Sequence, residues 1–434
     1  MRILVTGAYG FIGSHIAAHL ASQGHEIIAA GRDVSHGQRL FPFYEWVKCD
    51  FNRDTSVDDW LPRLAGVDAI VNCVGILQTN ARDKADAVHR AAPEALFKAC
   101  EQLGISRVIQ ISALGAGAKA NSTYGTSKAG GDKALAARDL DWVILRPSLV
   151  YGRGTYGGST LLRGLAGIPL LTPVPAGNQK IQPLFVDDLA IVVSRMLDPV
   201  APSRLTLDAV GPREMTAPSF IEAQRKWLGF RSQPLLRIPK SVSVIVFKLG
   251  DIAGLFGSRT PMRSTFLAMM NTPNTSPVEP LIRASGSIPR SVEQVFAAVP
   301  AQSQDRWHAR LIFLKPLLRL ALAAFWLATG LMLFHPATMA SAVGYIEAAG
   351  LNQFTSAANL AIGGGVFDVV VGAFLLFGWR MRAALILQLF GTLIYLAVLS
   401  ATLPGLWLDP LGPMIKLIPI MVATLALLAM VEER

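Results

Sequence analysis

The chain has 434 residues, of which 52% are apolar and 16% are charged, and its formal net charge is +10. The charged fraction lies well below the roughly 25% of an average soluble protein, so the composition excludes a disordered chain and indicates a membrane part. Lys and Arg are scattered along the front of the chain without interleaved aromatic residues, which argues against nucleic-acid binding, and the positive net charge fits attraction to anionic lipid.

The start of the chain indicates a cytoplasmic location for its front half. Residues 2–5 form a short β-like apolar run that leads directly into a glycine turn, whereas a secretory signal would carry a longer apolar core. The three cysteines, Cys49, Cys73 and Cys100, have neither metal-binding nor redox spacing. They are predicted to be buried thiols in a reducing compartment, and no metal site is predicted.

The first 210 residues alternate between short β-like apolar runs and helical patterns. The strand candidates are 2–5, 27–30, 68–73, 107–111 and 142–146. The helix candidates between them include 13–23, 84–103 and 124–138. This alternation predicts an α/β fold for residues 1–210, with a doubly wound parallel sheet and helices on both faces.

A glycine-rich turn at residues 6–13 follows the first strand candidate and opens the first helix candidate. Gly7 permits a tight turn, Gly10 lets the backbone approach a pyrophosphate, and Gly13 lets the helix pack closely on the strand. Because a helix N-terminus attracts anions, the turn predicts a dinucleotide site. The other residues of the turn assigned to this site are Thr6, Tyr9, Phe11 and Ile12.

The second strand candidate ends at Arg32 and Asp33, where an acidic residue binds the adenosine ribose in NAD sites. Arg32 favours NADP(H), because its guanidinium can pair with a 2′-phosphate. The alternative is a solvated Arg32 with Asp33 turned inward to bind NAD(H). Asp50, after the third strand, is assigned to the adenine. The residues assigned to the middle of the cofactor end the fourth strand and are Asn72, Val74 and Gly75.

Tyr124 and Lys128 lie four residues apart, which places them on the same face of a helix. Lys128 can then lower the pKa of Tyr124 and bind the nicotinamide ribose, which makes the phenol a general acid or base near neutral pH. Such a pair also arises by chance on a surface helix. Its position at the start of the helix between the fifth and sixth strands indicates catalysis.

Residues 1–215 resemble the extended or atypical short-chain dehydrogenases/reductases, which are of the NAD(P)-dependent epimerase/dehydratase type. The motifs that carry the resemblance are TGAYGFIGSH (6–15), YGTSK (124–128), LRPSLVYG (145–152) and PLFVDDLA (183–190). The resemblance implies a Rossmann fold, with Tyr124 as proton donor and acceptor and Lys128 on the ribose. It also implies that the backbone after Pro147 lies near the nicotinamide and that Asp187 braces the fold; helix capping is the alternative for Asp187.

Two positions depart from the family pattern. Residues 111–115 read ISALG where many members have paired Ser/Thr, so the third catalytic hydroxyl is Ser112 or is absent, and His89 stands where an asparagine is common. The SALGA stretch is closer to the atypical branch that includes the nucleotide-binding accessory subunit of respiratory complex I, whose role is largely structural.

Residues 211–305 are patterned more loosely and are predicted to form a small substrate-covering region and linker. An amphipathic stretch at 241–257 contains Lys248 and Asp251, and it is shorter than the roughly 20 residues that cross a bilayer. It is therefore expected to be an interfacial or core helix.

Residues 306–434 are predicted to form a four-helix transmembrane bundle. The apolar segments near spanning length are 314–334, 357–379, 383–403 and 411–431. Basic residues precede the first segment and lie between the second and third, whereas the loops 335–356 and 404–410 have no Lys or Arg. By the positive-inside rule, both termini and the nucleotide-type domain are expected on the cytoplasmic side of the inner membrane.

Asp368 lies at the centre of the second apolar segment, where an ionisable residue indicates function. Gly364 and Gly372 flank it at four-residue spacing, so Asp368 is expected to point into the bundle. Lys416 is the expected partner, with Gln388 as a weaker one. The pair either fixes helix register or forms a proton or quinone-type site.

Two motifs in the last third of the chain are DRWHARLIFLKPLLRL (305–320) and WLDPLGPMIKLIP (407–419). With them, residues 306–434 resemble the DoxX-like membrane domain. The resemblance implies a loose association with quinone-linked redox work. Three hypotheses follow: a membrane-anchored NADP(H)-dependent oxidoreductase or epimerase/dehydratase with a lipid-soluble substrate; a non-catalytic NADPH-binding assembly or sensing subunit with a membrane partner or a second copy; and an active membrane bundle regulated by the front domain.

Overall fold

The computed structural model describes residues 1–76, 79, 83–116, 122–175, 179–255, 264, 274–353 and 355–431. The described residues up to Arg310 form one compact unit, and those from Leu311 onward form a second. All three cysteines lie in the first unit as free thiols, with Cys49 and Cys100 buried and Cys73 half-buried. Burial raises the pKa of each to about 12.

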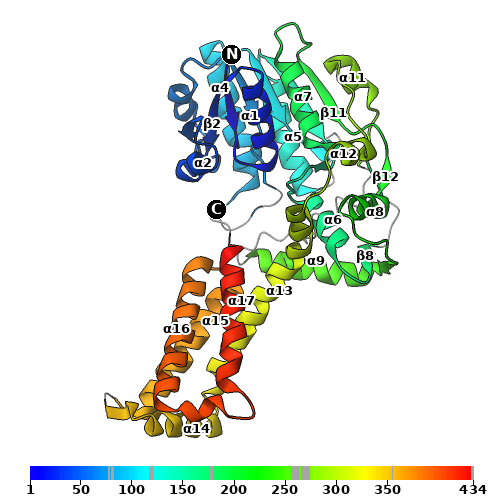
Figure 1. Ribbon diagram of the computed structural model, residues 1–434. Coiled ribbons are helices and arrows are strands. Elements are labelled where there is room, and N and C mark those ends of the chain that lie inside the picture. The colour runs from blue at the N-terminus through cyan, green and yellow to red at the C-terminus, as the bar shows by residue number, and fades with distance from the viewer. Residues whose placement is uncertain are drawn as a thin grey trace. The chain divides into compact units, whose positions relative to one another are not determined.

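The first unit is built on a seven-stranded sheet with the order β11-β6-β5-β4-β1-β2-β3. All neighbouring strands in it run parallel (Figure 1). The strands are β1 (Arg2–Thr6), β2 (Glu26–Gly31), β3 (Glu45–Lys48), β4 (Ala69–Asn72), β5 (Arg107–Ile111), β6 (Asp141–Pro147) and β11 (Leu205–Ala209). The five strand candidates and the parallel α/β architecture are confirmed, and β11 is a strand that the sequence pattern did not predict.

Helices cover both faces of the sheet, because successive side chains of each strand point to opposite faces. In β1, Ile3 and Val5 join the cluster under α1 and α7, whereas Leu4 joins the cluster under α4. The helices of this layer are α1 (Phe11–Ser22), α2 (Val34–Leu40), α3 (Val57–Trp60), α4 (Ala92–Leu103), α5 (Thr123–Ala136) and α7 (Val186–Leu197). A π-helix (Ala87–Ala91) leads into α4, and 3₁₀ turns occur at Leu61–Leu64 and Leu114–Ala116.

A smaller covering region draws on residues both before and after position 211. Its two-stranded pairs are β7–β10, β8–β13 and β9–β12. The strands are β7 (Val150–Tyr151), β8 (Thr172–Pro175), β9 (Lys180–Ile181), β10 (Leu184–Phe185), β12 (Met215–Thr216) and β13 (Leu235–Ile238). The helices are α6 (Gly158–Gly167), α8 (Ala217–Trp227), α9 (Lys240–Leu255), α11 (Glu279–Ser285) and α12 (Val292–Ala298). The helix expected at 241–257 is present as α9; residues 256–257 lie outside the described residues.

The second unit is helical. Its helices are α13 (Ser303–Met332), which starts in the first unit, α14 (Pro336–Ala348), α15 (Ala357–Phe377), α16 (Met381–Thr402) and α17 (Pro413–Ala429), with 3₁₀ turns at Leu351–Gln353 and Pro404–Trp407. Among the described residues, α13, α15 and α16 are long and apolar enough to cross a membrane, whereas α17 is apolar but has 17 residues. Three of the four expected spans are thus present at full length, and α14 is a helix that was not predicted.

Candidate functional site

The glycine turn between β1 and α1 has the geometry that its sequence predicts. Gly7 has a φ of +67°, and its carbonyl accepts a hydrogen bond of 2.8 Å from the Gly10 amide. A Cβ on Gly13 would lie 2.3 Å from the Gly7 oxygen, so only glycine allows this approach. In the described chain α1 begins after Gly10 without a side-chain cap. Its first-turn amides therefore form an anion site that fits a diphosphate.

The side chains of Thr6 and Asn72 bind each other at the carboxyl ends of β1 and β4. Thr6 Oγ1 donates to Asn72 Oδ1 over 2.5 Å, and Asn72 Nδ2 donates to Gln110 Oε1 on β5 over 2.7 Å. All three side chains are buried. This chain joins three neighbouring strand ends below the turn, and Gln110 is a member that the sequence interpretation missed.

Phe11 and Ile12, the first two residues of α1, lie on different sides of the helix start. A Cβ on Gly152 would lie 3.4 Å from the Phe11 ring, so this ring faces the segment after β7. Ile12 packs against the core cluster between α1 and the sheet. Neither position offers a side-chain polar group, so a cofactor would meet their backbone amides.

Tyr9 fills the space at the end of β2. A Cβ on Gly31 would lie 2.4 Å from its ring, and its hydroxyl accepts a hydrogen bond of 3.2 Å from the Arg32 amide. Asp33 is the N-cap of α2 and accepts from the His36 amide over 2.9 Å. The helix cap therefore engages one oxygen of the Asp33 carboxylate, and the side chain stays exposed at the end of β2.

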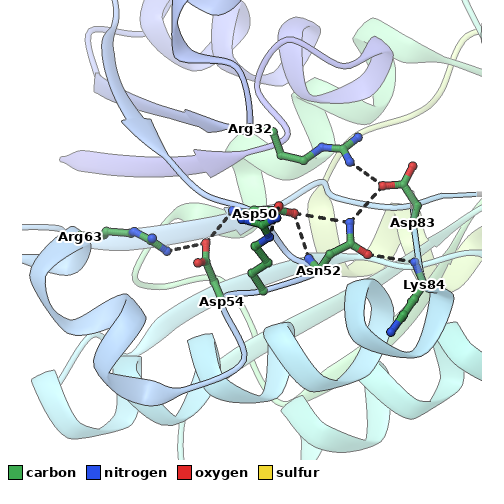
Figure 2. A network of polar contacts seen from close by, with 8 residues as sticks. Arg32, Asp50, Asn52, Asp54, Arg63, Asp83 and Lys84 are labelled. Carbon is green, nitrogen blue, oxygen red and sulfur yellow. Dashed lines mark hydrogen bonds and ion pairs between the residues drawn. The ribbon is translucent and has the colours of Figure 1, made fainter. Parts of the chain in front are cut away.

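Arg32 is bound by a carboxylate that the sequence interpretation missed. Its Nη1 lies 2.5 Å from Asp83 Oδ1, to which Asn52 Nδ2 also donates over 3.0 Å (Figure 2). The Asp83 side chain is 7% exposed and that of Arg32 is 46% exposed. Arg32 is thus paired with Asp83 while much of its side chain stays exposed, an arrangement that neither sequence alternative included.

Asp50 belongs to the same network but faces its own loop. Its Oδ1 accepts from the Asn52 amide over 3.1 Å, and its Oδ2 lies 3.9 Å from Arg53 (Figure 2). Asn52 in turn accepts from the Lys84 amide over 2.9 Å. The network therefore ties the loop after β3 to the segment around Asp83, at the edge where the adenosine end of a cofactor was predicted.

Lys128 lies on α5 and is turned toward two strand ends. It is 3% exposed, and its Nζ donates to the carbonyls of Val74 (3.2 Å) and Ile111 (3.0 Å). A Cβ on Gly75 would lie 2.9 Å from Nζ, so this glycine makes room for the ammonium group. Burial lowers the pKa of Lys128 to about 8.

Tyr124 is the second residue of the same helix, after the N-cap Ser122 and Thr123, and is half-buried. Burial raises its pKa, and Lys128 does not oppose that shift. The expectation that Lys128 lowers the pKa of Tyr124 is therefore wrong for this structure, because the ammonium group is directed to the Val74 and Ile111 carbonyls. The phenol stays protonated at neutral pH.

His89 connects the loop after β4 to α5. Its Nε2 accepts from the Ile76 amide over 3.0 Å, so its proton is on Nδ1, which donates to Ser127 Oγ over 2.8 Å. Ser127 Oγ donates to the Tyr124 carbonyl over 2.9 Å. Burial, together with Lys128, lowers the pKa of His89 to about 2, so the ring is neutral. His89 thus positions the start of α5.

Ser112, the candidate third hydroxyl, lies in a buried polar group with Asp132 and Arg146. Its Oγ has no well-formed hydrogen bond in the described part of the chain. Burial raises the pKa of Asp132, and the Ser112 hydroxyl and the Arg146 guanidinium at 2.9 Å oppose that rise. Asp132 follows Lys128 by four residues on α5, which is a spacing that could have identified it.

The backbone after Pro147 is engaged by neighbouring strands. Pro147 pairs with Ala209 across β6 and β11, and the Ser148 amide donates to the Ala209 carbonyl over 3.0 Å. Asp187 binds His15 of α1 over 2.6 Å, whereas its neighbour Asp188 binds Arg290 in the covering region over 2.6 Å. Both carboxylates therefore tie α7 to other elements.

In the membrane-type unit, Asp368 is 7% exposed and points into the bundle as predicted. Its Oδ1 accepts a hydrogen bond of 3.4 Å from the Tyr395 hydroxyl of α16. Lys416 is exposed, and Gln388 donates to Thr424 over 2.6 Å. The expected pairing of Asp368 with Lys416 or Gln388 is therefore wrong, because the phenol on the neighbouring helix takes that position.

Two family models match separate parts of the chain. Residues 3–204 match the NAD dependent epimerase/dehydratase family, and residues 323–425 match the DoxX-like family. The chain thus joins a domain of the first family to a domain of the second.

Curated relatives match the front half. A ceramide reductase of Caulobacter vibrioides is 28% identical over 191 residues, which are 43% of this chain and 58% of that protein. Subunit 9 of the NADH dehydrogenase (ubiquinone) 1 alpha subcomplex from Arabidopsis thaliana is 27% identical over 237 residues, which are 51% of this chain and 58% of that protein. The chain therefore spans little more than half the length of either relative.

Solved structures share the fold of the first unit. The structure of gox2253 aligns with a TM-score of 0.53 at 19% identity and covers 71% of this chain and 99% of its own. MoeE5 in complex with UDP-glucose and NAD aligns with a TM-score of 0.51 at 20% identity, over 71% of this chain and 99% of its own. At this level of identity the likeness concerns the fold.

Proposed function

We propose that this chain, which joins an epimerase/dehydratase-type domain to a DoxX-like domain, is a membrane-anchored NADP(H)-dependent oxidoreductase that reduces a lipid-soluble carbonyl compound. One arrangement carries the proposal. The uncapped start of α1, the buried Lys128 and the half-buried Tyr124 all lie at the carboxyl ends of the parallel strands. Open α/β sheets bind their ligands at this edge.

The residues at this edge fit a nicotinamide dinucleotide. The first-turn amides of α1 would hold the diphosphate, and the partly exposed Arg32 would meet a 2′-phosphate. When the cofactor binds, the Lys128 ammonium group would give up its hydrogen bond to one backbone carbonyl and donate to the nicotinamide ribose instead. When bound, the cofactor supplies the hydride. The structures of MoeE5 and of another neighbour, a UDP-glucuronic acid 4-epimerase, hold NAD, which supports a nicotinamide dinucleotide as the cofactor. The proposed preference for NADP(H) over NAD(H) rests on Arg32.

Tyr124 is the proposed proton donor in the reduction. A phenol whose pKa is raised by burial carries its proton at neutral pH, so it can donate that proton to a carbonyl oxygen that receives a hydride. The neutral His89 does not compete for the proton, because its Nε2 is occupied by the Ile76 amide. Its link through Ser127 keeps the Tyr124 backbone in place.

The second unit supports a substrate that partitions into membranes. Among the described residues it has three helices long and apolar enough to cross a bilayer, so the front unit stays near any lipid-soluble substrate. One relative is named a ceramide reductase, which also favours a membrane lipid. An epimerase/dehydratase that acts on another class of substrate is the competing assignment within the same family.

The test is single-turnover reduction of a long-chain keto-lipid by NADPH, with the full chain in lipid nanodiscs. Tyr124→Phe should lower the rate by about 10²–10⁴-fold while NADPH binding is kept. Tyr44→Phe, which removes another hydroxyl of the same unit, should leave the rate unchanged. Equal rates for Tyr124→Phe and the unchanged protein would remove the catalytic role.

A second candidate is a non-catalytic NADPH-binding assembly subunit. The His89 in place of the family's asparagine and the Ser112 hydroxyl buried beside Asp132 favour it, as does the similarity to an NADH dehydrogenase subunit. It predicts that NADPH stabilises the first unit, by about 2.7 kcal/mol at a hundredfold excess over Kd, without turnover of any substrate. A membrane protein that co-purifies in stoichiometric amount would support this candidate.

A further inference from the structure

Helix α9 exposes apolar side chains and buries a polar one. Ser243, Phe247 and Gly250 form its buried stripe, at four- and three-residue spacing. On the opposite side Ile245 is 59% exposed and Leu249 is 60% exposed. A helix on a water-facing surface has the reverse arrangement, with its apolar stripe inward. The outer side of α9 is therefore built for surroundings other than water.

The loop between α6 and β8 exposes leucines in the same unit. Leu170 is 84% exposed, and its φ of +73° is a backbone conformation that costs a branched side chain free energy. Leu171 beside it is 40% exposed. Strain of this kind persists where it serves a function, and an exposed leucine in water gives no compensating gain.

These two features belong to one surface. β8 pairs with β13, which places Leu235, 46% exposed, opposite Thr172 at the end of the leucine loop. β13 ends at Ile238, and α9 begins two residues later. Figure 1 shows β8 and α9 at the same end of the first unit. We call the loop 168–171, β13 and the outer side of α9 the apolar face.

Basic residues and an exposed tryptophan accompany the apolar face. Arg231 and Arg237 flank or belong to β13 and are exposed, as is Lys248 on α9. Trp307 is 63% exposed, and the Arg310 guanidinium lies 4.9 Å from the centre of the Phe230 ring. Apolar residues rimmed by Arg, Lys and Trp match the headgroup boundary of an anionic bilayer.

The start of α13 lies next to the leucine loop. A Cβ on Gly167, at the end of α6, would lie 2.4 Å from the Ala309 carbonyl oxygen, so the two helices touch there. Leu170 follows Gly167 by three residues, and the long apolar stretch of the chain begins at Leu311. The point at which the chain leaves this unit toward its apolar helices is therefore beside the apolar face.

We propose that the apolar face is a membrane-docking surface that inserts into the interface of an anionic bilayer, with Leu170 and the outer side of α9 below the headgroups. The occupant is lipid because the chain carries its own spanning helices, which hold this unit within reach of the bilayer, and because the rim is basic. The inference concerns attachment and is independent of catalytic turnover.

The test uses an environment-sensitive fluorophore on single introduced cysteines, Leu170→Cys and Leu249→Cys, in the full chain. Burial raises the pKa of the native thiols to about 12, so an exposed cysteine is labelled selectively. In nanodiscs of phosphatidylcholine and phosphatidylglycerol, both probes should shift to the blue and lose most of their emission to doxyl-labelled lipid, at a depth of about 5–10 Å.

Val200→Cys is the matched control, since Val200 is 90% exposed and lies between α7 and β11. Its probe should stay water-like and unquenched. Probes at 170 and 249 that behave like the one at 200 would overturn the proposal. Probes that are shielded from water but not quenched by lipid would also overturn it, because a protein surface, from a second copy or another chain, would then cover the face.

Discussion

The two units differ in how much of their apolar surface is exposed. Leu4 and Ile70 of the sheet unit and Leu375 of the helical unit are buried, but the apolar helices α15 and α16 also expose Val370 and Phe390. The apolar strands of the sheet unit are covered by helices on both faces, whereas the exposed apolar sides of α15 and α16 suit a hydrocarbon environment. An exposed apolar side chain is therefore unfavourable only where its surroundings are water, and the same reasoning applies to the outer side of α9.

The units also differ in how they treat a buried charge. In the sheet unit the ammonium group of Lys128 is held by two backbone carbonyls at strand ends. In the helical unit the carboxyl group of Asp368 has the Tyr395 hydroxyl on a neighbouring helix. Strand ends offer free carbonyls, but helix interiors do not, so side chains have to supply the partner there.

The largest expected effect comes from placing the same charge on an exposed valine of each unit. Val370→Asp, on a 46% exposed position of α15, should weaken membrane insertion by about 2.5–3.5 kcal/mol. Val200→Asp, on a 90% exposed position of the sheet unit, should change stability by less than about 0.5 kcal/mol. Membrane fractionation and thermal unfolding measure the two effects. Equal effects of the two substitutions would contradict the inference that the two units have different surroundings.

The buried ammonium group predicts a pH dependence of the sheet unit. The pKa of Lys128 is lowered from 10.5 to about 8, so at this residue the unfolded chain binds more protons between these values, and the contribution of Lys128 to stability rises with pH across that window. The rise should be about 3 kcal/mol and should vanish in Lys128→Met. Thermal unfolding between pH 7 and 10.5, with the exposed Lys133→Met as control, measures it. The same pH profile in Lys128→Met would contradict a buried charge.

A methyl group added where two backbone segments lie close together should lower the free energy of unfolding by a similar amount in both units. A Cβ on Gly13 would lie 2.3 Å from the Gly7 oxygen, and one on Gly330 would lie 2.6 Å from the Gly365 oxygen. Gly13→Ala and Gly330→Ala should each destabilise their unit by about 1–3 kcal/mol, since packing does not depend on the solvent. Gly115→Ala, with no atom within 4 Å, is the control. Destabilisation by only one of the two variants would show that the units differ in how tightly their backbones pack.

The smallest expected effect concerns the partly exposed ion pair at the end of β2. Arg32→Ala should weaken NADPH binding about tenfold and NADH binding little, and Asp83→Asn should strengthen NADPH binding by releasing the guanidinium (Figure 2). Fluorescence titration with both nucleotides gives the ratio of affinities. Equal losses for NADH and NADPH in Arg32→Ala would mean that Arg32 does not meet the 2′-phosphate.

Much of the architecture follows from patterns of short range. β1, β2 and β6 contain continuous apolar runs, and the helices α13, α15 and α16 are long apolar segments, so each could be predicted from its own residues. The edge strand β11 has exposed positions and was missed, because its pairing with β6 is what makes it a strand. α14 was also missed, because its residues lie within the segment 335–356, which was interpreted as a loop between two spans.

The glycine turn and the spacing of Tyr124 and Lys128 on one helix can be read from the local sequence, since both depend on residues within one or two turns of chain. The partner of each charged group, in contrast, depends on the tertiary structure. Asp83 reaches Arg32 from 51 residues away, and Tyr395 reaches Asp368 from 27 residues away. The direction of the Lys128 ammonium group was also decided there, because the carbonyls that bind it belong to the ends of two other strands. Such partners depend on how segments that are distant in the sequence pack together, and a local sequence pattern does not contain that information.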